Sequence, residues 1–451
     1  MVKKILLFLL VGCNVGVYAQ DAGWKNLFDG KTLNGWRQLN GKAKYEVING
    51  TIVGTTVTGE PNSFLATNED YGDFILELEL KAGNMNSGIQ FRSISSPADN
   101  NGRVRGYQAE VDPSERAWSG GIYDEARRGW MYQTEMNPAA KKAFIKDGWN
   151  KYRIEAIGSV IRTWVNDVAV SYIVDDMTLK GLIALQVHGV KERAGGAQIQ
   201  WKNIRIQTGA AMKPRPHDIS TPVANYTLNT ISPQEKAQGF SLLFNGKDLT
   251  GWRSVLQQTP PRQGWVVENG VLKVLAQDTA AGTKWGDLVS VNQYGAFELN
   301  FDFKLTEGAN SGVKYFVTEP FPNSKSGLGL EYQVLDDERH PDAKMGKAGN
   351  RTMGSLYDLI ASTKVEPRHQ KKIGEWNHGK IVVLPDNTVQ HWLNGFKVVE
   401  YKRGSNEFNE LVAGSKYAKQ ENFGLAEKGP VLLQDHNDLV YYRNIKIRTI
   451  K

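Results

Sequence analysis

A chain of 451 residues has room for two to three domains, each large enough to bury a full core. Its hydrophobic fraction of 40%, with 46 glycines and 17 tyrosines, is typical of a folded, turn-rich β protein and excludes a disordered chain. The net charge of +7 is not gathered into lysine or arginine runs in the mature part, so we expect no nucleic-acid partner.

Residues 1–19 have the layout of a signal peptide. Two lysines precede an apolar run from Ile5 to Val11, and Val17-Tyr18-Ala19 forms a small-residue cleavage site. The apolar run is too short to cross a bilayer, so we expect no membrane span. The signal-peptide layout predicts export across the inner membrane, into the periplasm. The alternative is a lipoprotein anchored through Cys13, which ends a lipoprotein-like cleavage box. Cys13 is also the only cysteine, so no intrachain disulfide can form.

After this segment the sequence repeats itself once. Residues 27–37 return as residues 243–253, and Asn86-Ser87-Gly88 returns as Asn310-Ser311-Gly312. This period is far longer than the roughly 20–50 residues of solenoid repeats, so we interpret it as a duplicated domain. The predicted units are residues 23–208 and residues 239–451, joined by a proline-containing linker over residues 209–238.

Alternation of apolar and polar residues dominates both copies. Residues 74–81 and 297–304 place apolar side chains on one face and carboxylates on the other. Many short strands with little helical periodicity predict an all-β fold, a two-sheet antiparallel sandwich in each copy. The glycine and aromatic pattern favours a jelly roll over an immunoglobulin-like topology. Ser232-Pro233-Gln234-Glu235 is a capping box, which predicts a short helix before the second copy.

The same alternation places polar side chains together on the face opposite the core. In the first copy this set is Gln90, Arg92, Gln108, Glu110, Asp112, Gln186 and His188. In the second copy the matching positions carry Lys314, Glu331, Gln333, Gln434 and His436. Each copy thus keeps a carboxylate, a carboxamide and a histidine, which indicates two related but non-identical pockets. The alternative is an ordinary solvated sheet face. Trp118 fits either sugar stacking or a core position.

One carboxylate pattern supports a second hypothesis. Glu110, Asp112 and Glu115 have a spacing that resembles the catalytic strand of laminarinase-type retaining glycosidases. There a bulge brings the outer two carboxylates about 5 Å apart as nucleophile and acid/base. Pro113 either marks such a bulge or ends the strand. The second copy lacks the first two acids of the pattern.

Longer motifs carry a more specific resemblance. They are the Phe-Asp/Asn-Gly-Lys-x-Leu-x-Gly-Trp segment near the start of each copy, the Asn-Ser-Gly motifs, and residues 331–342, 357–360 and 424–448 in the second copy, with residues 112–125 in the first. This set resembles the 3-keto-disaccharide hydrolase family over nearly all of the mature chain. The resemblance implies two tandem concanavalin A-like jelly rolls. It also implies that the partner is a mono- or disaccharide or glycoside oxidised at C3.

The implied chemistry is glycosidic bond cleavage by β-elimination, or net hydrolysis if water adds afterwards. A C3 ketone acidifies the C2 hydrogen, so the reaction needs a base, an oxyanion stabiliser and an acid. In the first copy the candidates are Glu110 or His188 as base, Arg92 as stabiliser, and Asp124 or Glu125 as acid or sugar anchor. In the second copy they are Glu331 or His436, Lys314, and Asp358. The candidate sugar-binding residues are Gln90, Gln108, Asp112, Trp118, Glu125, Gln186, Gln333, Asp336, Tyr357 and Gln434.

No cofactor is assigned from the sequence. The polar set contains Asp, Glu and His, so a structural or catalytic divalent metal is compatible with it, but no His-x-x-x-His or Glu-x-x-His spacing supports a specific site. The rival class is a non-catalytic, lectin-like protein on the same fold. Convergence of histidine, carboxylate and lysine or arginine favours an enzyme. The second copy is closer to the family's usual pattern, so the resemblance implies that it is the catalytic domain.

Overall fold

The computed structural model describes most of the chain after the expected signal segment. Described are residues 23–451 except Asp99, residues 192–193, His217, residues 277–284, Phe321 and residues 365–368. The expected signal peptide and Cys13 lie outside the described residues and stay predictions. Among the helices of the described part, none is long and apolar enough to cross a membrane.

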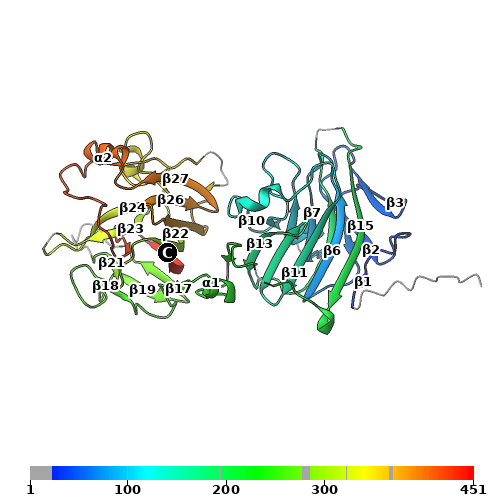
Figure 1. Ribbon diagram of the computed structural model, residues 1–451, viewed down its shortest axis with the longest axis horizontal. Coiled ribbons are helices and arrows are strands. Elements are labelled where there is room, and N and C mark those ends of the chain that lie inside the picture. Colours follow the sequence, from blue (N-terminus) through cyan, green and yellow to red (C-terminus); the bar gives the residue numbers. More distant parts are fainter. Residues whose placement is uncertain are drawn as a thin grey trace, which may run out of the picture.

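The chain forms two β-sandwiches that lie side by side (Figure 1). The larger sheet of the first sandwich has the strand order β16 (Ala224–Asn225), β13 (Val168–Val174), β12 (Val160–Val165), β11 (Asn150–Ile157), β6 (Phe74–Lys81), β15 (Gln198–Thr208), β4 (Thr51–Thr55) and β3 (Lys44–Ile48), with β1 (Lys25–Asn26) paired to β15. Its second sheet has the order β10 (Gly129–Tyr132), β9 (Ile122–Glu125), β8 (Arg105–Val111), β7 (Ser87–Ile94), β14 (Leu182–Val187), β5 (Ser63–Thr67) and β2 (Trp36–Asn40).

The second sandwich repeats this plan with fewer strands. Its larger sheet has the strand order β19 (Trp265–Glu268), β20 (Val271–Val274), β29 (Val440–Thr449), β22 (Phe297–Leu305), β25 (Asn377–Val383), β26 (Thr388–Leu393) and β27 (Phe396–Lys402), with β17 (Ser241–Leu242) paired to β29. The other sheet runs β18 (Trp252–Ser254), β21 (Leu288–Ser290), β28 (Leu432–Leu433), β23 (Asn310–Thr318) and β24 (Leu328–Leu335). The pairings within both sandwiches are antiparallel, apart from the parallel contact of β16 with β13. The predicted tandem all-β jelly-roll fold is confirmed.

Helices are short and lie outside the sheets. Within the described residues they are α1 (Pro233–Ala237), α2 (Asn406–Ala413) and the 3₁₀ turns Asn100–Gly102, Pro138–Lys142, Gly209–Ala211 and Pro341–Lys344. The predicted capping box at α1 is confirmed, because Ser232 Oγ accepts the Glu235 N–H and Glu235 accepts the Ser232 N–H. α1 lies between the two sandwiches (Figure 1).

Each sandwich has its own apolar core between its two sheets. The first core includes Leu76, Leu78, Ile89, Phe91, Tyr107 and Trp201. The second core includes Leu299, Phe301, Val313, Tyr332 and Val334. These residues alternate along their strands, so burial of one strand face, which the alternation predicted, is what holds the two sheets together.

The two copies share one strand register at the polar face. Gln90 lies opposite Gln108 on β7 and β8, and Lys314 lies opposite Glu331 at the same place on β23 and β24. The residue-by-residue correspondence expected from the sequence repeat is therefore correct at this face. Any difference in chemistry between the copies arises from side chains on a common backbone.

Candidate active site

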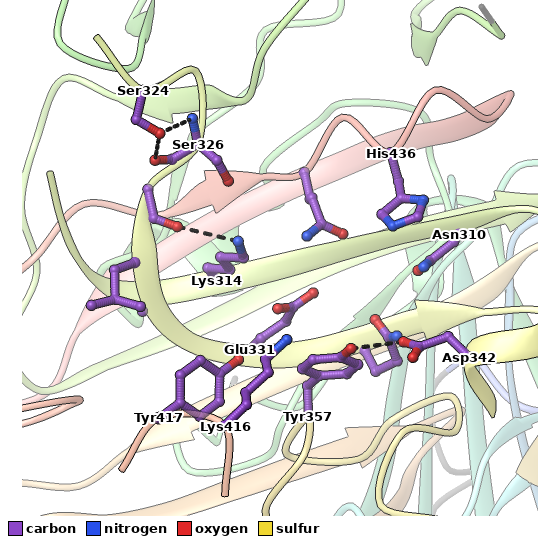
Figure 2. Close-up of a pocket in the computed structure, with 15 residues that line it drawn as sticks. Asn310, Lys314, Ser324, Ser326, Glu331, Asp342, Tyr357, Lys416, Tyr417 and His436 are labelled. Atoms are coloured by element: carbon purple, nitrogen blue, oxygen red, sulfur yellow. Dashed lines mark hydrogen bonds between the residues drawn. The ribbon is translucent and has the colours of Figure 1, made fainter. Parts of the chain in front are cut away.

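The second sandwich carries a pocket of about 390 Å³ over its five-stranded sheet (Figure 2). Strands β23 and β24 supply its floor, and the turn before β24, the segment after α2 and the segment after β28 supply its walls. The lining residues are Asn310, Lys314, Ser324, Ser326, Gly327, Leu328, Gly329, Glu331, Gln333, Asp342, Tyr357, Lys416, Tyr417, Gln434 and His436. Carboxylates, ammonium groups, phenols and an imidazole converge here, as catalysis on a polar substrate requires.

The structure brings most of the second-copy candidates together in this pocket. They are Glu331, His436, Lys314, Gln333, Gln434 and Tyr357. Asp336 and Asp358 lie outside the lining. Asp336 accepts the backbone N–H groups of Glu338 and Arg339 in the loop after β24, and that of Gly308 in the turn before β23. Asp358 accepts the Lys416 N–H and a guanidinium N–H of Arg351, so it shapes the wall of the pocket instead of facing it.

Glu331 stands at the centre of the pocket. Glu331 is only 5% exposed to solvent, yet its carboxylate has no hydrogen bond or ion pair to any residue that the structure describes. Figure 2 shows it between Lys314 on one side and Lys416 with Tyr357 on the other. Burial raises its pKa, and the nearby ammonium groups of Lys314 and Lys416 oppose this shift. A buried carboxylate with free lone pairs is suited to accept a proton from a bound substrate.

The glycine of the Asn-Ser-Gly motif makes room for this carboxylate. A Cβ atom on Gly312 would lie 2.1 Å from Glu331 Oε1, so any side chain there would require the Glu331 carboxylate to move. Gly88 has the same relation to the first copy, where a Cβ atom would lie 2.2 Å from Gln108 Cδ. The motif therefore allows the residue on the neighbouring strand to lie flat across the sheet, a close approach that only glycine permits.

Two lysines supply positive charge beside Glu331. Lys314 is buried and donates to Gly327 O over 3.2 Å. Lys416 lies with its ammonium 4.1 Å from the ring centre of Tyr357, and burial lowers its pKa. Lys314 is buried and Lys416 is exposed, and two cations beside a buried carboxylate can stabilise an oxyanion that forms next to it.

A hydrogen-bonded network of Asp342 and Arg351 holds Tyr357 in place. Its hydroxyl donates to Asp342 over 2.7 Å, and Arg351 binds the other oxygen of Asp342 over 2.7 Å. Burial alone would raise the pKa of Asp342, but these two hydrogen bonds outweigh burial and lower it. Asp342 is therefore a hydrogen-bonded carboxylate that orients Tyr357, whereas the carboxylate of Glu331 has no hydrogen bond among the described residues.

One cluster at the edge of the pocket has the side chains of a metal site. Within the described residues, ligand atoms of His340, His436 and Asp438 lie within 4.8 Å of one another. Asp438 accepts the Asn310 N–H over 2.9 Å, and the Nδ1 atom of His340 accepts the Asp342 N–H over 3.2 Å. Two imidazoles and one carboxylate form a donor set that suits a divalent transition metal.

In the first copy the corresponding polar groups bind one another. Asn86 and Gln108 donate to the two oxygens of Glu110 over 2.6 and 3.0 Å, and Gln90 donates to Gln108 over 2.7 Å. Burial raises the pKa of Glu110 to about 7, although these hydrogen bonds act against the shift. The carboxylate of the first copy is thus saturated with donors, in contrast to Glu331.

The expectation that Arg92 shares the polar face is wrong. Arg92 has a positive φ of 44°, at a register irregularity between β7 and β8 that interrupts the alternation of side chains. Its guanidinium is buried and donates to Gly72 O, Gly158 O and Asp73. Arg92 therefore ties strand β7 to other parts of the first sandwich and does not lie with Glu110.

The remaining first-copy candidates are dispersed. Asp124 binds Arg127 and Arg128, Glu125 binds Arg103, and Asp112 binds Ser114 and Arg116. His188 is exposed, and Gln186 is buried with its backbone oxygen accepting Ser87 Oγ. Trp118 is 2% exposed and packs against Trp130 and against Phe396 of the second sandwich, so it serves as a packing residue at the domain interface.

The pattern that suggested a retaining glycosidase is not continuous on one strand. β8 ends at Val111, and Glu115 is exposed in the turn that follows. Pro113 therefore ends the strand and marks no bulge within it. Glu110 and Glu115 are not presented together by one strand face, as the retaining arrangement would require.

Several pocket residues were not identified from the sequence. They are Asn310, Ser324, Ser326, Asp342, Lys416 and Tyr417. Lys416 and Tyr417 lie in the segment of residues 403–431 between β27 and β28, whereas the first copy joins β13 to β14 through residues 175–181 only. The length difference between the copies was the available signal for this wall of the pocket.

Comparisons with known proteins agree with this geometry. A jelly roll with a polar pocket around a carboxylate fits the class of carbohydrate-active enzymes, although lectins share the fold. Residues 23–207 and 239–448 match the model of the 3-keto-α-glucoside-1,2-lyase-like domain, and the chain belongs to this family. The resemblance seen in the sequence is thereby confirmed.

Individual relatives correspond to about half of the chain. The chain is 34% identical over 245 residues to a 3-keto-disaccharide hydrolase from Bacteroides thetaiotaomicron, which covers 49% of this chain and 82% of the relative. It is similar to a proposed glycosyl hydrolase of known structure from Parabacteroides distasonis, with 32% identity, coverage of 50% and 100%, and a TM-score of 0.43. A carbohydrate-binding module, CBM66 from Bacillus subtilis, matches with 18% identity, coverage of 39% and 96%, and a TM-score of 0.27.

The charges around Glu331 predict a measurable response. Replacing Lys314 by Met removes a cation that holds the pKa of Glu331 down, so that pKa, already raised by burial, should rise further. Carboxyl ¹³C NMR titration would follow this change, with the exposed Lys247→Met as control. A Glu331 pKa at or below its ordinary value of 4.5 in the wild type would contradict the account.

Proposed function

We propose that the pocket of the second sandwich cleaves the glycosidic bond of glycosides and disaccharides that carry a ketone at C3, by removal of the C2 proton and β-elimination. The observation that carries this proposal is the buried carboxylate of Glu331, free of hydrogen bonds among the described residues and flanked by Lys314 and Lys416. Membership of the 3-keto-α-glucoside-1,2-lyase-like family supports the same substrate class.

The proposed reaction begins with proton transfer. The C3 ketone acidifies the C2–H bond, and Glu331 takes this proton while the electron pair forms an enolate between C2 and C3. The negative charge develops on the C3 oxygen, where the ammonium groups of Lys314 and Lys416 stabilise it. Neither the proton transfer nor the stabilisation of the enolate needs a nucleophile on the protein.

The enolate then expels the group at C1. Its electron pair forms a C1=C2 double bond, the C3 ketone is restored, and the C1–O bond breaks. The leaving oxygen takes a proton, for which His436 is the candidate acid because Tyr357 already directs its proton to Asp342. Addition of water to the unsaturated product would convert the overall reaction into a hydrolysis.

The carboxylates of the pocket favour this scheme over a retaining mechanism. A retaining glycosidase needs two carboxyl groups that share the work of nucleophile and acid/base. The two acids that line the pocket are Glu331 and Asp342, and Asp342 is held by Tyr357 and Arg351. One free carboxylate is sufficient for an elimination.

The proposal is tested by turnover of matched substrates. The protein should cleave a 3-keto-glucoside and leave the parent glucoside intact, because only the ketone makes the C2 hydrogen acidic. Glu331→Gln keeps the shape of the side chain and removes the base, so it should lower turnover by about 100-fold or more. Glu110→Gln is the matched change in the first copy and should retain activity.

Two results would contradict the proposal. Equal cleavage of the parent glucoside would remove the requirement for a ketone. Full activity of Glu331→Gln together with loss in Glu110→Gln would move the chemistry to the first sandwich.

The space beneath Glu331 gives a second prediction. In Gly312→Ala the new Cβ would meet Glu331 Oε1 at 2.1 Å, so the carboxylate must turn away and turnover of the keto substrate should fall about 10-fold or more. Gly88→Ala creates the same crowding against Gln108 in the first copy and is the control, with activity expected to stay near wild type. Turnover and thermal melting should be measured together, and an active Gly312→Ala protein would refute this role.

A further inference from the structure

A second cavity lies between the two sandwiches. Its volume is about 330 Å³, and it is lined by the larger sheet of the second sandwich, by Gln238 and Phe240, by Met136 of the first sandwich, and by the linker residues Ile219, Ser220, Pro222 and Val223. It is separate from the pocket around Glu331, because the two cavities share no lining residue and lie on different sheets. Pockets of this size bind small organic molecules.

The cavity contains a lysine that forms no contact ion pair with the described residues. Lys380 on β25 has no hydrogen bond or ion pair with the residues that the structure describes, and its ammonium lies 4.3 Å from the ring centre of Trp392. Burial lowers its pKa. The carboxylate that acts on it electrostatically, Glu298, also binds Arg448, so this position is suited to a ligand that supplies a further anion.

The first copy shows what the same position looks like when it is satisfied. Arg153 is the fourth residue of β11, as Lys380 is of β25, and it binds Glu77, Glu155 and the backbone oxygen of Lys213. In the second copy the strand partner that corresponds to Glu77 is Asn300. The residue two positions after Lys380 is Val382, where Arg153 has Glu155. Both anionic partners have been lost while the cation was kept.

The other charges near the cavity are already balanced. Glu298 binds Arg448, Glu235 binds Lys446, and Asp302 next to His378 binds Arg443. Glu298 is the carboxylate that acts on Lys380 electrostatically, and its charge is shared with Arg448. The cavity therefore keeps a surplus of one positive charge, which matches a monoanion better than a dianionic phosphate.

The rest of the lining favours a hydroxylated ligand. The side-chain nitrogen of Gln238 donates to Ile219 O and Thr221 O, and that of Asn300 donates to Glu298, so their amide oxygens are left to accept hydroxyl hydrogens. Trp392 and Phe240 add aromatic surface. We propose that this cavity binds a small sugar acid, with its carboxylate on Lys380, between the two sandwiches.

The test uses the whole protein and glucuronate as probe, with glucose as its neutral counterpart. Isothermal titration calorimetry should show binding of glucuronate but not of glucose. Lys380→Gln should weaken this binding about 10-fold or more, since it removes the cation that pairs with the carboxylate. Lys402→Gln, an exposed lysine on β27 of the same sheet, is the matched control and should bind as the wild type does.

A measurement on the wild type avoids any folding defect of the variant. Glucuronate should slow the acetylation of Lys380 by acetic anhydride, read by mass spectrometry, and glucose should not. Three outcomes would overturn the proposal: no glucuronate binding, equal binding of glucose, or binding that survives Lys380→Gln but is lost in Lys314→Gln. The last result would place the sugar acid in the pocket around Glu331.

Discussion

A carboxylate that is removed from water and given no hydrogen bond costs free energy, and the second sandwich is built around such a group at Glu331. The cost is tolerable because Lys314 and Lys416 lie near enough to act on its charge electrostatically. Gly312 gives it space, and Asp342 takes the hydrogen bond of Tyr357 that would otherwise be available to it. The pocket therefore keeps one buried carboxylate free of hydrogen bonds among the described residues.

The duplication shows how few side-chain changes separate this arrangement from that of the first copy. At the same strand register, the first copy places Gln90 and Gln108 where the second has Lys314 and Glu331, and its carboxylate at Glu110 accepts hydrogen bonds from two neighbouring amides. The backbone, including the close approach at the glycine, is common to both copies. The two copies differ in whether this carboxylate accepts hydrogen bonds from neighbouring side chains or has none among the described residues. On the larger sheet, Lys380 likewise lacks the two anionic partners that Arg153 has in the first copy.

Much of this could be predicted from the sequence because alternation along a strand sets the faces of a sheet. It correctly predicted two sandwiches, and it grouped Lys314, Glu331, Gln434 and His436. It failed at Arg92, where a positive φ turns the side chain out of the alternating pattern. Asp358 was a candidate from the repeated Tyr-Asp motif, and it lies in a turn that no strand period describes. Lys416 comes from a segment that the first copy lacks, and the spatial role of Gly312 depends on a contact between neighbouring strands.

The central claim is that bond cleavage begins with removal of the C2 proton by Glu331. The most direct measurement is a single-turnover comparison of a 3-keto-glucoside carrying hydrogen or deuterium at C2, which reports the chemical step without product release. The account predicts slower cleavage of the deuterated substrate, with release of the C2 label to solvent. Equal rates for both substrates, with the deuterium retained at C2 in the product, would contradict it.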